Sequence, residues 1–270
     1  MLDAHIHLTD DRVWGLASQW LEEARSAGIR GWVLAGTHPA EWARQLEFKA
    51  HTSADGFVVK TSCGLHPYWV RAGEIDRMLE RLQAEAQRFD AIGETGLHAE
   101  GARPVANIAA QERVFRAHLE LAKELEKPLI LHVVREHARA LALLEHMGFA
   151  TAIGQGAPLR GMVHSFSGSI PSLDQYLRAG WLISISGGGG LLHPSAKRRE
   201  VLRAIPRDRL LVETDAPDQA LAPGASGGNR PSALLRVAEA LGRARGFGET
   251  GRSLLEDSRR NLAKLWPDLL

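Results

Sequence analysis

Two histidines at alternating positions open this sequence, in Met1-Leu2-Asp3-Ala4-His5-Ile6-His7-Leu8. Because side chains alternate between the two faces of a β-strand, a strand here places Asp3, His5 and His7 on one face and apolar residues on the other. Two imidazoles on one rigid support are suited to bind a metal ion. The alternative is that the histidines merely alternate on a half-exposed edge strand, since so short a motif is only a hypothesis.

Other residues of metal-ligand type occur at the ends of predicted strands: Glu94, His132, His164 and Asp215. With His5 and His7 they supply four imidazoles and two carboxylates, more than the three protein ligands typical of one catalytic ion. The set fits a pair of divalent ions about 3.5–4 Å apart, bridged by Glu94, that lower the pKa of water and neutralise a leaving oxygen. Imidazole-rich ligation favours Zn²⁺, Mn²⁺ or related ions over Ca²⁺.

Each of these residues also has an ordinary structural explanation. A histidine in an apolar strand, such as His132, is commonly a hydrogen-bonded core residue. An isolated Glu94 or Asp215 could cap a helix or pair with an arginine. The metal site is favoured because all the candidates fall at strand ends. The other histidines lack that placement and are predicted at the surface; they are His38, His51, His118, His137, His146 and His193.

Apolar strand-like segments alternate with helical stretches along the chain. Strands are predicted at residues 1–8, 29–36, 56–63, 91–97, 129–134, 161–166, 181–186 and 210–214. Helices are predicted at residues 12–27, 39–50 and 74–88, within 104–126, and at 136–147, 231–244 and 253–265, with a further helix starting near Pro194 and Ser195.

Strands that alternate with helices, without a linker or low-complexity break, predict one α/β domain over residues 1–270. The predicted fold is a single (β/α)₈ TIM barrel with an amidohydrolase-like metal site at the carboxyl ends of its strands. The alternative, a doubly wound open sheet, would place its site at one switch point. The polar residues are spread over strands one, three, four, five, six and eight, and only a closed ring brings those ends together.

Composition limits the possible partners. The 270 residues are 44% apolar and 24% charged, with a formal net charge of +1. This charge argues against a broad basic surface that grips duplex DNA, but not against a local pocket for one nucleic-acid end. The single cysteine, Cys63, excludes a disulfide framework or thiolate cluster within the chain. A strand at Leu2 leaves no room for a signal peptide and no apolar run reaches membrane-span length, so a cytoplasmic protein is predicted.

Several short motifs occur in order over nearly the whole chain. They are residues 3–8, Gly93-Glu94-Thr95-Gly96-Leu97, the apolar strand with His132, His164-Ser165-Phe166-Ser167-Gly168, residues 213–217, Asn229-Arg230-Pro231 and the closing Ser258-Arg259-Arg260-Asn261. Together they resemble the TatD family of metal-dependent hydrolases. Residues 131–137 resemble the YjjV-like branch of that family.

The resemblance implies a TIM barrel that hydrolyses phosphodiesters, chiefly as a deoxyribonuclease and often from a 3′ end. It implies two divalent ions (Zn²⁺, Mn²⁺ or Mg²⁺), one held by His5, His7, Glu94 and Asp215 and the other by Glu94, His132 and His164. On this interpretation Asp215 and Glu94 are catalytic, and Asp215 holds the attacking water and takes its proton. The partner is DNA or another phosphodiester, as a single strand or frayed end, with no membrane and no obligate protein partner.

Two positions depart from the family pattern where substrate would enter. His98 stands where the family usually has Asp, and Tyr68 follows His66-Pro67 where the family often has His. Neither change removes a ligand, so both bear on the substrate more than on the metal.

Further roles are predicted around the ligands. Asp3 and Glu213 lie two residues before ligands on the same strand faces, where they could accept the second ring N–H of a ligand histidine or pair with a buried base. His66 could hydrogen-bond the scissile phosphate, or only orient its loop.

Substrate oxygens are the predicted partners of Arg135 and Arg230, each of which could equally form a surface ion pair. The glycine run 187–190 could aim the backbone N–H groups of Gly188 and Gly189 at a phosphate. A plain flexible loop is the alternative for this run.

The predicted function is therefore a metal-dependent phosphodiesterase, specifically a TatD-type deoxyribonuclease. An amidohydrolase or esterase acting on a small metabolite is the alternative, because the same ions polarise a carbonyl equally well. A metal-stabilised binding subunit is disfavoured because no ligand is missing.

Overall fold

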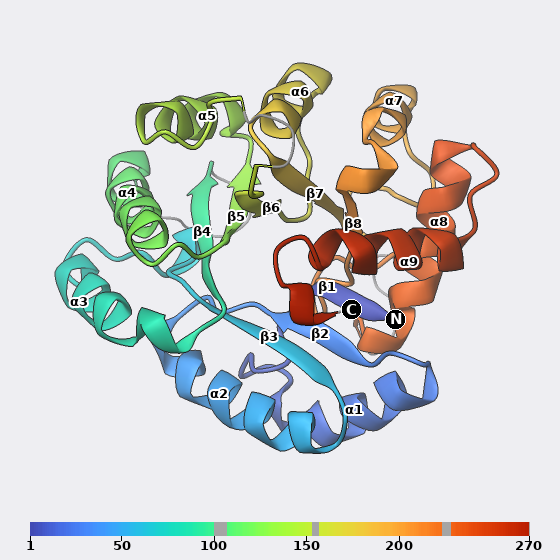
Figure 1. The fold of residues 1–270 in the computed structure, drawn as a ribbon, viewed down its shortest axis with the longest axis horizontal. Coiled ribbons are helices and arrows are strands. Elements are labelled where there is room, and N and C mark those ends of the chain that lie inside the picture. Colours follow the sequence, from blue (N-terminus) through green and yellow to red (C-terminus); the bar gives the residue numbers. More distant parts are fainter. Residues whose placement is uncertain (100–106, 153–156, 223–227, 270) are drawn as a thin grey trace.

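Eight parallel strands curl into a nearly closed barrel inside a ring of helices (Figure 1). The computed structural model describes residues 1–99, 107–152, 157–222 and 228–269. Strands pair in chain order, and the pairs from β1 to β8 are parallel. They are β1 (Leu2–Ile6), β2 (Gly31–Leu34), β3 (Val58–Cys63), β4 (Ala91–His98), β5 (Leu129–Val134), β6 (Gly161–Val163), β7 (Trp181–Ile185) and β8 (Leu210–Val212).

Helices connect successive strands and cover the outside of the barrel (Figure 1). They are α1 (Ala17–Ser26), α2 (Pro39–Ala54), α3 (Ile75–Glu85), α4 (Ile108–Glu124), α5 (His137–His146), α6 (Ile170–Arg178), α7 (Ala196–Ala204), α8 (Leu234–Arg245) and α9 (Gly251–Leu262). The predicted (β/α)₈ TIM barrel is confirmed. Residues 104–106 of the segment predicted to contain a helix lie outside the described residues.

Backbone hydrogen bonds join the first and last strands at their carboxyl ends. The N–H of Asp215 donates to the carbonyl of His5 at 3.0 Å, and the N–H of His7 donates to the carbonyl of Ala216 at 2.9 Å. These bonds close the ring at the point where two of the predicted ligand segments meet.

The barrel interior is apolar in its lower part, toward the amino ends of the strands, and polar at the carboxyl ends. Ile130 and Met162 precede His132 and His164 by two residues, and Leu211 precedes Asp215 by four, so each shares its ligand's strand face. These apolar residues belong to one buried cluster with Val33 and Leu182, which the chain end covers with Trp266 and Leu269. The alternation of each strand therefore places ligand-type side chains in the layer at the carboxyl ends.

Five strands end earlier than predicted, at Ile6, Leu34, Val163, Ile185 and Val212. Beyond the ends of β6 and β8 the chain turns at Ser165 and Asp215, which adopt left-handed conformations with φ of 43° and 56°. The predicted helix at residues 12–27 is also shorter, since a 3₁₀ turn (Trp14–Leu16) precedes α1. The helix start expected near Pro194 is found, with Ser195 as the N-cap of α7.

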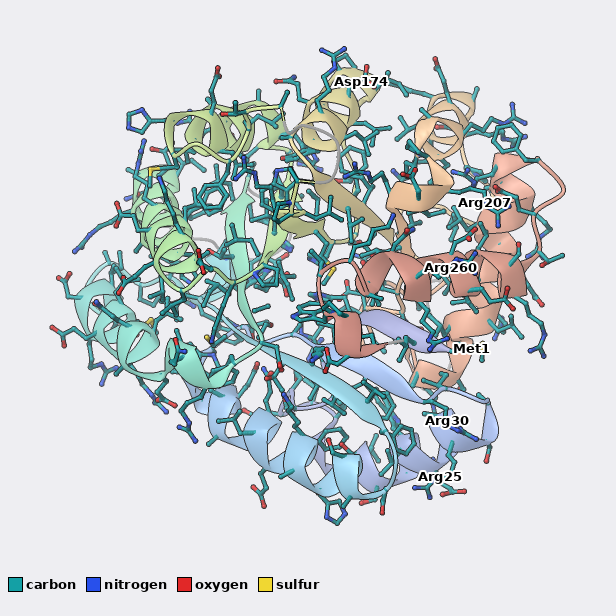
Figure 2. All side chains as sticks on the ribbon, in the orientation of Figure 1. Met1, Arg25, Arg30, Asp174, Arg207 and Arg260 are labelled. Carbon is teal, nitrogen blue, oxygen red and sulfur yellow. The ribbon has the colours of Figure 1, made fainter. Side chains whose placement is uncertain are left out.

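Charged side chains lie on the outer side of the helices, as the labelled Arg25 of α1 and Asp174 of α6 show (Figure 2). Within the described residues, no helix is both long enough and apolar enough to cross a membrane.

Helix α9 is fastened to the last strand by two buried polar side chains. The hydroxyl of Ser258 accepts the N–H of Val212 at 3.0 Å. The side-chain amide of Asn261 donates to the carbonyls of Arg207 and Leu210, at 2.7 and 2.9 Å. The motif near the chain end thus fixes β8, the strand that precedes Asp215.

We expect Asn261→Ala to lower the free energy of unfolding by about 1–3 kcal/mol, because it leaves two carbonyls without their donor. Urea denaturation followed by circular dichroism measures this change. Glu256→Ala, on the exposed side of the same helix, is the control and should stay within about 0.5 kcal/mol of the parent. A similar loss for both variants would mean that the helix, and not the amide, is responsible.

Candidate metal centre

A cavity of about 610 Å³ lies at the carboxyl ends of the strands. Its size falls in the range of small-molecule sites, about 300–1,000 Å³. Of the predicted ligands, all but the fully buried His5 line it: His7, Glu94, His132, His164 and Asp215. The barrel therefore brings together the residues that the sequence placed on five separate strand ends.

The first group of donor atoms consists of Oε2 of Glu94, Nε2 of His5, Nε2 of His7 and Oδ1 of Asp215. The Nε2 atom of His5 lies 3.3 Å from Oε2 of Glu94 and 3.7 Å from Oδ1 of Asp215. The Nε2 atom of His7 lies 3.6 and 3.1 Å from the same two oxygens. Ligand atoms bound about 2.0–2.1 Å from a tetrahedral ion are about 3.3–3.4 Å apart. The spacing of this group therefore suits one small cation.

A second group of donor atoms gathers on the other oxygen of the same carboxylate. Oε1 of Glu94 lies 2.8 Å from both Nδ1 of His132 and Nε2 of His164, and these nitrogens are 2.9 Å apart. Glu94 thus places one oxygen in each group. This is the arrangement expected of a carboxylate shared between two ions.

Buried polar atoms without partners show that the residues present fit a cation. Among the described residues, Nε2 of His5 and Oε2 of Glu94 have no hydrogen-bond partner and no access to solvent. A buried polar atom left unpaired costs about 1–3 kcal/mol. A divalent ion held between an imidazole nitrogen and a carboxylate oxygen would satisfy both atoms at once.

The charges of the site support the same conclusion. Burial would raise the pKa of Glu94, but the surrounding imidazoles, led by His164, hold that pKa well below its usual range. Burial likewise opposes ionisation of Asp215, yet its hydrogen bond with His7 lowers the pKa. Despite its own burial, His7 has a pKa raised to about 9 by Asp215. Cation binding by these ionised acids therefore competes with protons on the imidazoles.

Glycines on both sides of Glu94 let β4 lie against β5. A Cβ atom at Gly93 would lie 2.4 Å from the carbonyl oxygen of Ile130, and one at Gly96 would lie 2.0 Å from that of His132. Both glycines also have positive φ, 134° and 146°. Only glycine fits such positions, which explains the Gly-Glu-Thr-Gly motif around the shared carboxylate.

Left-handed backbone places Asp215 in the site. Its φ of 56° costs about 1–3 kcal/mol in a non-glycine residue and is held by the bond from its N–H to His5. The turn directs the carboxylate toward His7, where Oδ1 lies 3.1 Å from Nε2. Strain of this kind clusters at functional sites.

The two acids predicted beside the ligands behave differently. Glu213 lies where it was expected, with Oε1 3.5 Å from Nδ1 of His164, and it also accepts the N–H of Ser165 at 2.7 Å. The expectation for Asp3 was wrong. It accepts the N–H and the hydroxyl of Thr214, at 2.9 and 2.6 Å, because its position low in the barrel faces β8 and not an imidazole. Burial raises its pKa to about 7.

His66 lies at the cavity floor with a defined tautomer. Its Nδ1 accepts the N–H of Tyr68 at 3.0 Å, so the proton of the neutral ring is on Nε2, which lies 3.4 Å from Oε1 of Glu94. Burial, with the nearby His132, lowers the pKa of His66 to about 3 and keeps the ring neutral. A neutral ring with Nε2–H at the cavity is a suitable donor to a phosphate oxygen.

His98 contacts the ring nitrogen of His132 that points away from Glu94. Its Nδ1 lies 2.9 Å from Nε2 of His132, and its own Nε2 lies 3.4 Å from the hydroxyl of Tyr68. Burial lowers the pKa of His98 to about 4, so it is neutral. Because Nδ1 of His132 faces Glu94, Nε2 of His132 can carry the proton and donate it to His98. His98 thus supplies the acceptor that orients His132.

Neither of the two arginines predicted to bind substrate, Arg135 and Arg230, lines the cavity. Arg230 forms an ion pair with Glu23 of α1 at 2.6 Å, away from the described cavity lining. Arg135 has an exposed side chain and also lies outside that lining, because the left-handed backbone at this residue (φ 61°) turns the chain away after β5. Gly188 and Gly189 do line the cavity.

Sequence reasoning missed several residues of the cavity wall. Arg12, held by Asp10 and Asp218, lies at one side. The exposed indole of Trp69 lies at another, and Arg198 of α7 at a third. Arg12 and Trp69 lie in loops shortly after β1 and β3, and Arg198 lies in the first turn of a helix, positions that many surface residues share.

One of the histidines predicted at the surface is instead in the core. His118 is fully buried, accepts the N–H of Leu65 on Nε2 at 3.0 Å and donates from Nδ1 to the carbonyl of Val114 at 2.8 Å. It joins α4 to the segment before His66.

The family model described as TatD related DNase matches residues 2–266. The chain belongs to the TatD family. The resemblance seen in the motifs is therefore confirmed, and the chain is a metal-dependent hydrolase that acts on ester bonds.

Relatives within the TatD family match most of the chain. The protein named 3'-5' ssDNA/RNA exonuclease TatD of Erwinia billingiae is 36% identical over 219 residues, 80% of this chain and 79% of the relative. The uncharacterized metal-dependent hydrolase YjjV of Escherichia coli is 31% identical over 242 residues, 87% of this chain and 86% of the relative. The crystal structure of YjjV from Escherichia coli superimposes with a TM-score of 0.82 at 28% identity, over 99% of this chain and 98% of that chain.

We expect His98→Ala to weaken divalent-metal binding about 10- to 100-fold, because Nε2 of His132 loses its acceptor. Competition with a chromophoric chelator measures the affinity. His98→Asp restores an acceptor of the kind usual in the family and should recover most of the binding. Tyr68→Phe, which changes only the far end of this chain of hydrogen bonds, is the control. An unchanged affinity in His98→Ala would contradict the role given to His98.

Proposed function

We propose that this TatD-family hydrolase uses two divalent ions to cleave phosphodiester bonds of single-stranded DNA or RNA, removing nucleotides from the 3′ end. The name of the 36% identical Erwinia relative supports the choice of single strands and the polarity. Residues 1–270 would act as one catalytic domain, in the cytoplasm.

The observation that carries the proposal is the position of Glu94. One of its oxygens belongs to the group with His5, His7 and Asp215, and the other to the group with His132 and His164. Two ions held by these groups would stabilise both the attacking and the leaving oxygen of a phosphoryl displacement.

The first group would hold one ion and the second group the other, as Zn²⁺, Mn²⁺ or Mg²⁺. When bound, such ions lower the pKa of water and neutralise charge on the leaving oxygen.

The residues of this chain supply the proton transfers and the positioning. Asp215 is the proton acceptor for the attacking water, since its carboxylate is ionised and lines the cavity. Glu94 fixes the spacing of the two donor groups. His66 donates its Nε2–H to a non-bridging oxygen of the scissile phosphate.

Aromatic side chains make a nucleotide a better fit than a small ester. Tyr68 and Trp69 lie on the cavity wall beyond β3, and the Trp69 side chain is 43% exposed. Its indole N–H donates to the hydroxyl of Thr37 at 3.3 Å, which holds the ring in place. Aromatic rings of this kind stack on bases without sequence preference, each contributing about 1–3 kcal/mol.

Removal of metal tests the proposal directly. A protein stripped by a chelator, and shown metal-free by elemental analysis, should lose hydrolysis of 5′-labelled single-stranded DNA and regain it with Mn²⁺, Zn²⁺ or Mg²⁺. Products should shorten one nucleotide at a time from the 3′ end. Activity on carboxyl esters without any on DNA, RNA or p-nitrophenyl phosphodiesters would instead identify a small-molecule esterase.

Asp215→Asn separates chemistry from folding. An amide is a poor proton acceptor, so we expect kcat to fall about 10²- to 10⁴-fold while the circular dichroism spectrum stays native. Single-turnover assays at saturating metal measure the chemical step. Asp174→Asn, a surface change on α6 (Figure 2), is the matched control. A decrease of only a few-fold in Asp215→Asn would remove Asp215 as the base.

A further inference from the structure

The cavity wall above β6 and β7 contains an arginine, Arg198, that forms no ion pair with any described residue. Arg198 is the third residue of α7, whose first turn follows the glycine run after β7. Side chains of a helix lean toward its N-terminus, which directs Arg198 back to the barrel mouth. It lines the cavity together with Gly188, Gly189 and Ser167, which follow β7 and β6.

No acid of the described chain compensates this guanidinium. Its Nη1 is inaccessible to solvent and has no hydrogen-bond partner, and no carboxylate of the described residues forms an ion pair with it. Burial lowers the pKa of Arg198, as expected for a charge removed from water. The other arginine of the wall, Arg12, is held by Asp10 and Asp218.

An unpaired buried charge is costly unless a partner arrives with the substrate. The planar fork of a guanidinium offers five N–H donors that match the oxygens of a phosphate. The same cavity is lined by the hydroxyl groups of Ser167 and Ser186 and by Gly188 and Gly189, which have no side chain to keep an anion from the backbone. The wall therefore suits an anion.

The position of Arg198 indicates which phosphate it meets. The donor groups around Glu94 and the Nε2–H of His66 lie at the cavity floor, where the scissile phosphate would bind. Arg198 comes from a helix outside the barrel, at the rim, and on the side opposite the Tyr68–Trp69 wall, since β7 and β3 are four strands apart in a ring of eight.

We propose that Arg198 binds the phosphate next to the scissile one, so that the enzyme distinguishes polynucleotides from phosphodiesters with one phosphate. This inference rests on the proposed function. The nucleotide chain would cross the cavity from the aromatic wall, over the metal centre, to Arg198.

The first test compares two substrates. In Arg198→Gln, kcat/KM for a short single-stranded oligonucleotide should fall about 10- to 100-fold, the loss expected for a charge-assisted hydrogen bond. For bis(p-nitrophenyl) phosphate, which has one phosphate, the fall should be much smaller. Arg198→Lys should recover part of the loss. Arg199→Gln, an exposed neighbour with the same change of charge, is the matched control and should behave as the parent.

The second test does not depend on catalysis. Binding of a fluorescent oligonucleotide to the chelator-treated protein, followed by anisotropy over a range of salt, should show a slope smaller by about 0.7 in Arg198→Gln, the value for one single-strand phosphate contact. A neutral methylphosphonate at the linkage next to the scissile one should remove the difference between the parent and Arg198→Gln.

Each outcome decides a separate point. An equal loss on both substrates, or an unchanged oligonucleotide rate, would overturn the role of Arg198 while the parent's nuclease activity leaves the proposed function standing. A persistent difference with the methylphosphonate would also overturn it. If the parent neither binds nor cleaves any oligonucleotide, the proposed function fails, and this inference fails with it.

Discussion

One buried carboxylate organises the upper half of the barrel. Glu94 lies within 3.6 Å of nitrogen atoms from His5, His7, His66, His132 and His164. A carboxylate so fully removed from water would protonate if it stood alone, and these imidazoles keep it ionised. The arrangement requires residues from β1, β4, β5 and the segments after β3 and β6 to meet at one point. A ring of parallel strands is the fold that provides such a meeting.

The backbone near Glu94 is as specialised as the side chains. Gly93 and Gly96 allow β4 to approach β5, and left-handed conformations at Ser165 and Asp215 turn the chain just after β6 and β8. The hydrogen bond from the N–H of Asp215 to the carbonyl of His5 both closes the ring of strands and positions the proposed proton acceptor. Fold and site therefore depend on each other at the β1–β8 junction.

Much of this arrangement could be predicted from the sequence because strand alternation is a local rule. His5 and His7 on one face, and the ligand-type residues at strand ends, follow from a period of two and from the barrel topology. The partners of long polar side chains do not follow. Arg230 forms an ion pair with Glu23, more than 200 residues away in the chain. Asp3 accepts a hydrogen bond from the hydroxyl of Thr214 across the β1–β8 junction.

The role of single polar residues was equally beyond local rules. His118 shares the buried face of α4 with Phe115 and Ala122, but its polar type favoured a surface position; in the core its Nε2 accepts the backbone N–H of Leu65. The left-handed conformations of Ser165 and Asp215, which turn the chain after β6 and β8, are not marked by composition. The role proposed for Arg198 could not be predicted from the sequence, because it depends on the absence of an ion-pair partner among the described residues of the packed structure.

The balance of charge in the cavity explains how a nearly neutral chain could act on a polyanion. The carboxylates of Glu94 and Asp215 face imidazoles, and Asp10 and Asp218 are offset by Arg12. Ions bound at the proposed centre would be the largest charges there and would reverse the sign of the local field. Attraction for a phosphodiester would then arise at the reacting bond and at Arg198, and not over the whole surface. A net charge of +1 is therefore compatible with a nuclease that takes one end of a strand into its barrel.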